Sequence, residues 1–565
     1  MEPIISFKDF SFRYDSQAKP TITNINLDIY PNEKILILGP SGSGKSTLGR
    51  CLNGLIPNVF DGEITGEAFV AGQNIKKASI KDLSEKVGTV LQDTSAQFVG
   101  LTVAEDVAFI LENDNAPKDY LHREVDQWMD EMNIQELAQS SPHDLSGGQK
   151  QRVSMAGVLV SQPDILIFDE PLANLDPASG YKTMELIDEL HNDHHSTVVI
   201  IEHRLEDVLS QAVDRIIVLE KGRIIFNGAP AKLLKENLLL ETGIREPLYL
   251  SAIKYAGVDL EAVRAIEDVN QVASADMERK LKDWHQANVP EEKRSKEEEL
   301  LRLENIHFAY ESDQPIIKGI DLTVHKQDMI SIVGTNGAGK STLADILAAF
   351  NHPQEGLVFY EGQDITEDTI ARRAERVGYV MQDPNQMISQ HMIFDEVALG
   401  LRLRSVDESE IEDRVHQALK TCGLYPFREW PINALSFGQK KRLVIAAILV
   451  LEPEILILDE PTAGQDHYHY TEFMKVIRQL NESGMTILMI THNMQLMLEY
   501  TDRTLVIHDG QLIADETPFA VLNSEELTST ASLRVTSLSE LAKRMNIGDP
   551  LSFMQTFIDF EKGAE

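Results

Sequence analysis

The sequence predicts an α/β protein in which one domain occurs twice. Five short blocks recur in the same order at an offset of about 290 residues. They are GPSGSGKST, VLQD, LSGGQKQR, ILIFDEP and IEHR in 39–204, which return as GTNGAGKST, VMQD, LSFGQKKR, ILILDEP and THNM in 334–494. In both copies an apolar, β-branched run ends in a glycine-rich loop and is followed by a helix-forming stretch, which is typical of α/β units.

Three strands in each copy end in residue types that can carry chemistry. They are expected at 34–39, 163–170 and 196–203, and again at 329–334, 453–460 and 485–492. The first strand of each set ends in the glycine-rich loop, the second in carboxylates and the third in histidine. Because doubly wound sheets bind ligands at the carboxyl ends of their strands, these ends are expected to line one crevice in each copy.

The segments outside the repeats have a different character. Leucine and valine spacing after residue 231 predicts a small helical insertion, and the charged run at 290–300 predicts a solvated linker. The last residues predict short accessory helices. We therefore divide the chain into a first domain at 1–230, a helical insertion and acidic linker at 231–300, a second domain at 301–518 and a tail at 519–565.

Composition excludes several classes of protein. Lys and Arg number 52 against 90 Asp and Glu, and a formal net charge of −38 disfavours nucleic acid as a partner. Two cysteines outside any CxxC pattern indicate a reducing compartment rather than a disulfide framework. The start of the sequence lacks the pattern of a signal peptide. The longest uncharged apolar run, 443–451, is about half of what a membrane-spanning helix requires, so no span is expected.

The pattern GxxxxGK[ST] occurs in both copies and predicts phosphate binding. Its glycines let successive backbone N–H groups turn inward around phosphate oxygens at the start of a helix. Lys45 and Lys340 are then expected to reach the β- and γ-phosphates, and the hydroxyls of Ser46 and Ser341 to join the shell of a Mg²⁺ ion.

A pair of carboxylates follows the second strand of each copy. Asp169 and Asp459 are placed to organise a metal ion, while Glu170 and Glu460 can orient or deprotonate an attacking water. For an isolated Asp-Glu pair, the acidic start of a helix is the alternative. The matching phosphate loops favour the catalytic interpretation here.

With LSGGQ at 145–149 and LSFGQ at 435–439, the sequence resembles the ATP-binding cassette (ABC) family over residues 4–228 and 300–518. The resemblance implies two P-loop NTPase cassettes, each with a RecA-like parallel sheet, a helical subdomain and an antiparallel β element. It implies ATP hydrolysis with ATP and Mg²⁺ as cofactors. It also implies head-to-tail pairing, in which each ATP lies between the phosphate loop of one cassette and the signature helix of the other.

The family's functional residues map onto both copies without gaps. Tyr14 and Tyr310 match the residues that stack on adenine, with an ordinary edge-strand aromatic as the alternative. The catalytic assignments are Glu170, Glu460, His203 and His492. The residues assigned to phosphate binding are Gly39, Ser41, Gly42, Gly44, Lys45, Ser46, Thr47, Gly334, Asn336, Gly337, Gly339, Lys340, Ser341 and Thr342. The signature residues are Ser146, Gly147, Gly148, Gln149, Ser436, Gly438 and Gln439; the Q-loops contribute Gln92 and Gln382, and the D-loops Asp176 and Asp466. The residues assigned to Mg²⁺ are Ser46, Gln92, Asp169, Ser341, Gln382 and Asp459.

Two departures from the family pattern predict that the two sites are unequal. Phe437 replaces the first glycine of the signature motif in the second copy, and Gln465 stands where the first copy has Leu175. Both sites keep the lysine, the carboxylates, the glutamine and the histidine. We therefore expect two hydrolytic sites of different strength.

The stretches at 102–113 and 394–402 resemble the matching segment of the ATPases of energy-coupling factor (ECF) transporters, which import vitamins, a thiamine precursor and cobalt. The resemblance implies that Glu105, Asp106, Asp395 and Glu396 lie on helices that dock against a transmembrane coupling subunit. A second, substrate-binding membrane subunit is also implied. The expected location is the cytoplasmic face of the cell membrane, as a peripheral protein.

Three alternatives remain open at this point. The acidic helices can be amphipathic surface helices without a partner. A soluble twin-cassette translation factor would carry a basic connector, whereas 231–300 holds 11 Lys or Arg and 15 Asp or Glu, a net charge of 11 − 15 = −4. A sugar importer with fused cassettes usually has a weakened second site, whereas the second copy here is intact.

Overall fold

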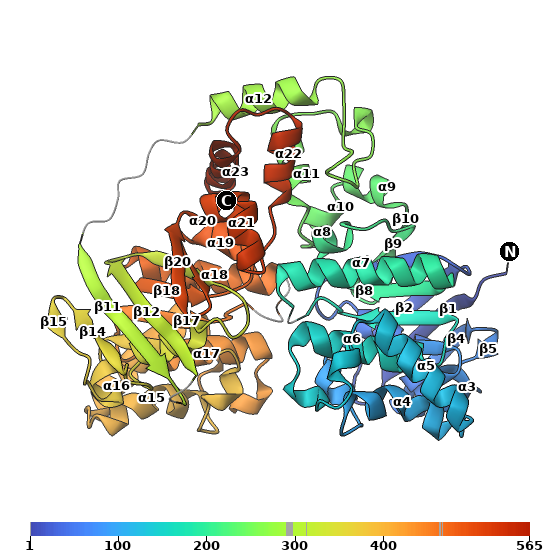
Figure 1. Cartoon of the computed structure of the whole chain (residues 1–565), viewed down its shortest axis with the longest axis horizontal. Helices are drawn as coiled ribbons and strands as arrows, with labels where there is room; N and C mark the ends of the chain where they lie inside the picture. Colours follow the sequence, from blue (N-terminus) through green and yellow to red (C-terminus); the bar gives the residue numbers. More distant parts are fainter. Residues whose placement is uncertain are drawn as a thin grey trace. The chain divides into compact units, whose positions relative to one another are not determined.

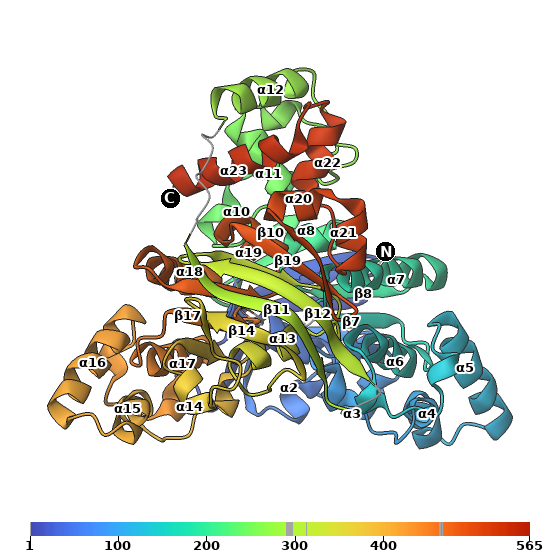
Figure 2. The ribbon, with the colours of Figure 1, turned by 60° about the vertical axis from the view of Figure 1, so that its left-hand side comes forward.

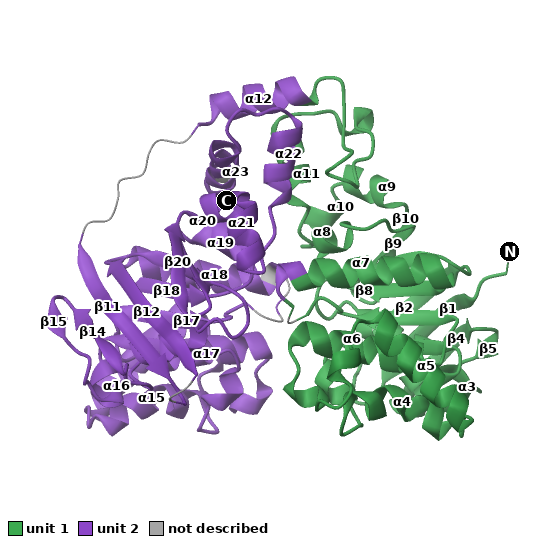
Figure 3. Ribbon diagram, in the orientation of Figure 1, with its two compact units in different colours: residues 1–175, 179–277 green, residues 176–178, 278–565 purple. Residues whose placement is uncertain are grey.

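The computed structural model describes residues 2–173, 175–289, 298–311, 314–462, 465 and 467–564. The chain forms two compact units, 1–175 with 179–277 and 176–178 with 278–565 (Figure 3). Each unit contains one copy of the repeated strands and phosphate loop. The short stretch around Asp176, which belongs to the first copy in sequence, clusters with the second unit.

The first unit contains a four-stranded and a six-stranded sheet (Figure 1). The small sheet has the order β2-β1-β4-β5 and is antiparallel. Its strands are β1 (Ile5–Tyr14), β2 (Ile22–Ile29), β4 (Gly62–Val70) and β5 (Gln73–Asn74). The large sheet has the order β10-β9-β3-β8-β7-β6, with β3 (Lys34–Leu38), β6 (Val87–Val90), β7 (Ile165–Asp169), β8 (Thr197–Ile201), β9 (Arg215–Glu220) and β10 (Arg223–Gly228).

The second unit repeats this arrangement. Its antiparallel sheet has the order β12-β11-β14-β15, with β11 (Glu299–Ala309), β12 (Pro315–His325), β14 (Glu355–Tyr360) and β15 (Gln363–Asp364). Its large sheet has the order β16-β17-β18-β13-β19-β20, with β13 (Met329–Val333), β16 (Val377–Val380), β17 (Ile455–Asp459), β18 (Thr486–Ile490), β19 (Arg503–His508) and β20 (Gln511–Glu516).

The central strands of the large sheets are parallel and fully buried, as their apolar runs predict. In the first unit β3 pairs with β8 on one side and with β9 on the other, and every residue of β3 is buried. β13 pairs in the same way with β18 and β19. A strand buried on both faces is continuously apolar rather than alternating. The predicted α/β class, with a parallel-sheet core and an antiparallel element in each copy, is confirmed.

Helices cover the large sheets and form separate helical lobes in both units. In the first unit they are α1 (Lys45–Leu52), α2 (Leu55–Asn58), α3 (Ile80–Ser84), α4 (Val103–Asn113), α5 (Lys118–Glu131), α6 (Gly147–Leu159), α7 (Pro177–His194), α8 (Leu205–Val208), α9 (Pro230–Lys235), α10 (Leu238–Glu241) and α11 (Leu248–Tyr255). In the second unit they are α12 (Met277–Ala287), α13 (Lys340–Leu347), α14 (Ile370–Arg373), α15 (Ile393–Leu403), α16 (Glu408–Thr421), α17 (Phe437–Leu449), α18 (His467–Glu482), α19 (Met494–Tyr500), α20 (Pro518–Asn523), α21 (Glu525–Thr530), α22 (Ser537–Arg544) and α23 (Pro550–Ala564).

The segment that follows the first repeat is divided between the two units. Residues up to 277 cluster with the first unit, where Tyr249 donates a hydrogen bond to the carbonyl of Ile266 (2.7 Å). From residue 278 on, α12 belongs to the second unit and packs on the C-terminal helix α23 (Figure 2). The ring of Trp284 contacts those of Phe553 and Phe560 at centroid distances of 5.9 and 5.5 Å. The expected linker at 290–300 falls largely outside the described residues.

A buried arginine closes the end of the helix that follows the second phosphate loop. Arg373 is 1% exposed and donates hydrogen bonds to the carbonyls of Ile346 (3.4 Å), Leu347 (2.9 Å) and Ile365. Two of these carbonyls lie in the last turn of α13, where backbone acceptors lack partners within the helix. The first copy has Leu83 at the matching position.

Replacing Arg373 with Leu, the residue of the first copy, is expected to destabilise the second unit by about 2 kcal/mol, because it removes the side-chain donor to the carbonyl of Leu347. The carbonyls of Ile346 and Ile365 keep the backbone N–H donors of Ala349 and Asp368. Thermal unfolding followed by calorimetry should show a lower midpoint for one transition. The control is the same substitution at an exposed arginine, Arg372→Leu, one residue earlier on α14. Equal midpoints for wild type and Arg373→Leu would contradict the role of this side chain.

Candidate functional site

The phosphate loops are built around glycines that no other residue can replace without strain. Gly44 and Gly339 precede the first helical residue with φ values of 103° and 102°. A Cβ at either position would lie 2.7 Å from an isoleucine side chain, that of Ile22 or Ile317. These turns bring Lys45 and Lys340 to the start of α1 and α13, where the backbone N–H groups point out of the helix.

Both loop lysines fold back over their own loop. The Lys45 ammonium donates to the carbonyls of Gly39 (2.7 Å) and Pro40 (3.1 Å). Lys340 donates in the same way to Gly334 and Thr335, both at 2.9 Å. Burial lowers the pKa of Lys340, and neighbouring carboxylates act in the opposite direction; they are Glu460, Asp459 and Asp176. The two loops therefore present matching cationic centres.

In the first unit, the side chains at the ends of β7 and β8 meet as predicted. Glu170 accepts a hydrogen bond from the Gln92 amide at 2.7 Å, and its carboxylate lies 4.0 Å from Nδ1 of His203. The same nitrogen is 3.3 Å from the buried carboxylate of Glu202. Burial, reinforced by the charge of Glu170, raises the pKa of Asp169 to about 6. The predicted glutamine, glutamate and histidine thus form one cluster.

The second unit brings the equivalent groups together with different partners. Ser341 donates to Asp459 at 3.3 Å, and the hydroxyl of Tyr379 donates to the same carboxylate oxygen at 3.3 Å. His492 places Nε2 3.7 Å from Oε1 of Glu460. Burial, reinforced by the charge of Asp459, raises the pKa of Glu460 to about 7. Gln382 is exposed at the turn after β16.

Comparison of matching positions identifies differences that motif recognition alone missed. Arg50 lies one turn after Ser46 on α1, where α13 carries Asp345 one turn after Ser341. Burial, reinforced by the charge of Asp459, raises the pKa of Asp345. Arg50 instead stacks over the ring of Phe60, with 4.4 Å to its centroid. Residues four apart on a helix share a face, so the two sites differ in charge beside the predicted metal position.

The two signature segments begin helices with identical caps. Ser146 and Ser436 each accept a hydrogen bond from the backbone N–H three residues later, and each capping box is closed by the side chain of Gln149 or Gln439. This arrangement fixes the start of α6 and α17 and leaves the first N–H groups of each helix directed outward. Phe437 occupies the first helical position of α17 and is 44% exposed.

The predicted adenine-stacking tyrosines lie in different surroundings. The Tyr14 hydroxyl is 3.1 Å from Oγ1 of Thr47 and accepts a hydrogen bond from Arg50 at 3.1 Å. Tyr310 is 62% exposed and its hydroxyl accepts from the amide of Asn351 at 3.2 Å. Of the D-loop residues, Asp176 clusters with the second unit, and Asp466 lies outside the described residues.

The acidic residues expected to meet a membrane partner are mostly engaged within their own loops. Asp106 accepts from the backbone N–H groups of residues 99 and 100, and Glu396 from those of residues 389 and 390. Glu105 accepts from the N–H groups of residues 101 and 102. Asp395 instead pairs with Arg402 at 3.0 Å on the surface of α15. Three of the four carboxylates therefore fix loop geometry.

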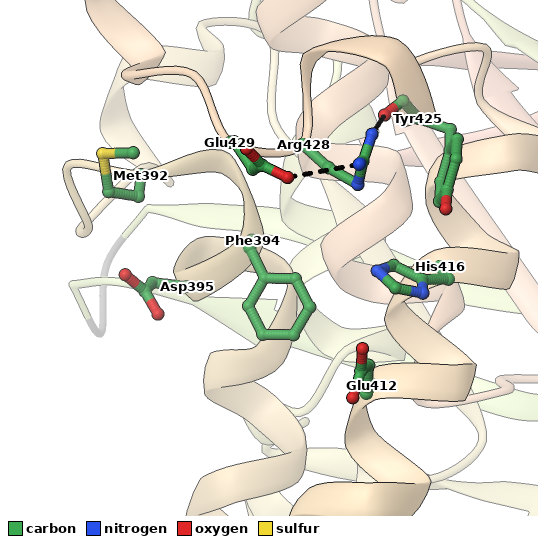
Figure 4. A pocket seen from close by; sticks show the side chains of 8 residues that line it. All are labelled: Met392, Phe394, Asp395, Glu412, His416, Tyr425, Arg428 and Glu429. Atoms are coloured by element: carbon green, nitrogen blue, oxygen red, sulfur yellow. Dashed lines mark hydrogen bonds and ion pairs between the residues drawn. The ribbon is translucent and has the colours of Figure 1, made fainter.

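An open pocket of about 460 Å³ lies between α15 and the segment from α16 to residue 429 (Figure 4). Phe394 and His416 face each other across it, with ring centroids 6.0 Å apart, and His416 in turn contacts Tyr425 at 5.1 Å. The rim is charged. The lining residues are Met392, Phe394, Asp395, Glu412, His416, Tyr425, Arg428 and Glu429.

Comparisons with known proteins find similar families and similar chains. The family described as "ABC transporter" matches residues 22–173 and 317–463, and one described as "ATP-binding cassette cobalt transporter" matches 236–308. A relative from Enterococcus faecalis is 55% identical over 99% of both chains, and one from Streptococcus mutans 52% identical over 100% of both; each is named as an ABC transporter ATP-binding protein. The solved structure of cbiO1 from Clostridium perfringens, part of the ABC transporter complex cbiONQ, is 33% identical and covers 44% of this chain and 100% of its own, with a TM-score of 0.39.

The chain belongs to the ABC transporter family, and it is an ATP-binding protein with two cassettes and ATPase activity. The resemblance of the sequence to the ABC family is thereby confirmed. Among the described residues, every helix is too short or too polar to cross a bilayer.

If Glu460 is the general base of the second cassette, as its place in the sequence predicts, its pKa determines how hydrolysis there depends on pH. Only the ionised carboxylate can accept a proton, so ATPase activity is expected to decline as pH falls through about 7. Burial lowers the pKa of His492 to about 4, which keeps its ring neutral in this range. The profile should be measured in a Glu170→Gln variant between about pH 5.5 and 8.5. A rate that is constant over this range, with folding verified by circular dichroism at each pH, would contradict the assignment.

Proposed function

We propose that this protein is the energy-coupling ATPase of an ECF-type importer and works at the cytoplasmic face of the cell membrane. Its partners in this proposal are a transmembrane coupling subunit and a substrate-binding membrane subunit. The match of 236–308 to the cobalt-transporter family supports the class of transporter. The observation that carries the proposal of a partner is the pocket between α15 and α16, an aromatic surface with a charged rim on a helical lobe.

The residues at the second phosphate loop fit a Mg²⁺ ion. Oγ of Ser341 and Oδ2 of Asp459 lie 3.3 Å apart, and hydroxyl and carboxylate oxygens are the ligands that Mg²⁺ prefers. Gln382 is available from the adjacent turn, and Ser46, Asp169 and Gln92 are their counterparts in the first unit. A bound ion would supply positive charge that offsets the negative charge developing on the phosphate oxygens.

The chain's own groups divide the work of hydrolysis. Lys45 and Lys340 neutralise phosphate oxygens at the start of their helices, aided by the N–H groups of the loops. Glu170 and Glu460 accept a proton from the attacking water, and burial of Glu460 brings its pKa near neutrality, where a general base works best. The neutral ring of His492, 3.7 Å from Glu460, orients the γ-phosphate and that carboxylate without competing for the proton.

The two cassettes act in this proposal as an intramolecular head-to-tail pair. Exposed N–H groups at the capped starts of α6 and α17 suit the γ-phosphate of an ATP held by the other cassette. ATP would then join the cassettes and hydrolysis would release them, which supplies a mechanical stroke to the membrane partners.

The proposal is tested by purifying a tagged full-length chain from detergent-solubilised membranes of its native host. Mass spectrometry should identify small multi-spanning membrane proteins bound to it. A Phe394→Asp, His416→Asp variant should lose them while keeping its ATPase activity. Leu240→Asp, at a residue that is 61% exposed outside the pocket, is the control and should retain them.

Each outcome separates the proposal from its alternatives. Recovery of ribosomal proteins without membrane proteins would favour a translation factor. Recovery of a periplasmic-type sugar receptor system would favour a sugar importer. Equal retention of membrane proteins by the pocket variant and the control would contradict docking at this surface.

A further inference from the structure

A buried lysine joins the signature helix of the second unit to the turn that carries Glu460. Lys441 lies on α17 and is 1% exposed. Its ammonium donates hydrogen bonds to the carbonyls of Glu460 and Pro461, each at 3.0 Å. The ring of Phe437, one helical turn earlier, has its centroid 5.3 Å from the same nitrogen. The two carbonyls and the ring face thus surround the charge, and an aromatic face attracts a cation.

The turn held in this way is conformationally demanding. Glu460 has a φ of 44°, in the left-handed region that is costly for a residue with a side chain. Its own N–H donates to the carbonyl of Ile490 at 2.9 Å, so both polar backbone groups of Glu460 are engaged. The direction in which the carboxylate points depends on this backbone. A group that fixes the backbone therefore fixes the position of the carboxylate.

The first unit builds the same turn without this lysine. Glu170 has a φ of 49°, and Gln151 stands where the second unit has Lys441. Gln151 is 5% exposed, and its amide nitrogen has no hydrogen-bond partner within the described part of the chain. The position that matches Phe437 is Gly147, which offers no ring. The second copy thus has both the ring of Phe437 and the ammonium of Lys441, and the first copy has neither group at the matching positions.

We propose that Lys441 is a positioning residue for Glu460 and that Phe437 shields its ammonium from water. This role explains why position 437 is not glycine. The ring of Phe437 covers the buried ammonium of Lys441, and the first copy has no such ammonium because Gln151 stands at the matching position. It also ties the start of the signature helix to the general base of the same cassette. The inference rests on the proposed catalytic role of Glu460.

The test uses the full chain carrying Glu170→Gln, so that hydrolysis reports on Glu460. Lys441→Met, which keeps the aliphatic stem and removes the ammonium, is expected to lower kcat about 10-fold while KM for ATP changes less than about threefold. Lys475→Gln removes a charge from an exposed part of α18 and should leave both constants unchanged. Affinity for a non-hydrolysable ATP analogue should be equal in the Glu170→Gln chain and in the two proteins that carry Lys441→Met or Lys475→Gln in addition.

A double-mutant cycle identifies the shielding role of the ring. Phe437→Gly should lower kcat about threefold when Lys441 is present and have no further effect in the Lys441→Met protein. Phe437 is 44% exposed, so Phe437→Gly is expected to fold. If Lys441→Met does not fold, an unchanged kcat in Phe437→Gly alone would still contradict the shielding role. Independent, multiplicative effects of the two substitutions would overturn the pairing.

The controls distinguish failure of this inference from failure of the proposed function. If Glu170→Gln, Glu460→Gln is inactive but Lys441→Met retains full kcat, Glu460 is the base and Lys441 does not position it. If the double glutamine variant still hydrolyses ATP at the rate of Glu170→Gln, the role of Glu460 itself is wrong. A rise in KM with unchanged kcat would assign Lys441 to nucleotide binding instead of positioning.

Discussion

Glu460→Gln is expected to lower the ATPase rate of the full chain by about 100-fold or more, and Glu170→Gln to lower it by less. Both substitutions remove a proton acceptor and keep the shape of the side chain. The effects should be unequal because the second phosphate loop pairs, in the proposed arrangement, with the unaltered signature LSGGQ. The first loop pairs with the segment in which Phe437 replaces glycine.

Steady-state phosphate release at saturating ATP measures this difference. The matched control is Glu452→Gln, a carboxylate that is 75% exposed and pairs with Arg414 on the surface. It should hydrolyse ATP at the wild-type rate. Small and equal losses in Glu170→Gln and Glu460→Gln would refute the assignment of these glutamates as general bases.

The second large effect is expected on nucleotide affinity. Lys45→Ala and Lys340→Ala should each weaken binding of ATP at their own loop by about 10-fold or more, because an ammonium that faces phosphates is replaced by a methyl group. Each lysine is held over its loop by two carbonyls, so its removal also takes one hydrogen-bond donor from each of them. Isothermal titration with a non-hydrolysable analogue should show the loss of one high-affinity site in each variant.

The double variant provides the decisive control for this prediction. Lys45→Ala, Lys340→Ala should bind no more nucleotide than the baseline, whereas Lys420→Ala, on α16, should bind like wild type. If both single variants retain two high-affinity sites, the loop lysines do not contact the phosphates. A loss of secondary structure in any variant, detected by circular dichroism, would require the conservative Lys→Arg exchange in its place.

Local sequence patterns predicted the elements that carry the site. The phosphate loops, the strand ends at Asp169 and Asp459, and the capped starts of the signature helices depend on spacing within a few residues. Such spacing determines turns and caps directly. These features therefore appear where the sequence placed them.

Contacts between distant segments could not be predicted in the same way. The hydrogen bond from Tyr379 to Asp459 joins two neighbouring strands, and Arg373 reaches the end of a helix 26 residues earlier. Lys441 looks like a solvated helix residue in sequence and is buried by the turn after Glu460. A position-by-position comparison of the two copies would have marked all three residues, since the first copy has Thr89, Leu83 and Gln151 there.

The packing of α12 on α23 has a consequence for how the second cassette can be separated from the first. The helix that precedes its first strand and the helix that ends the chain cover each other through Trp284, Phe553 and Phe560. A fragment that begins at residue 301 would therefore expose an aromatic surface at its far end and tend to associate through it. A fragment that begins at residue 277 contains α12, which covers the aromatic surface of α23. The second cassette is therefore better separated from the first before α12 than at the start of the repeat.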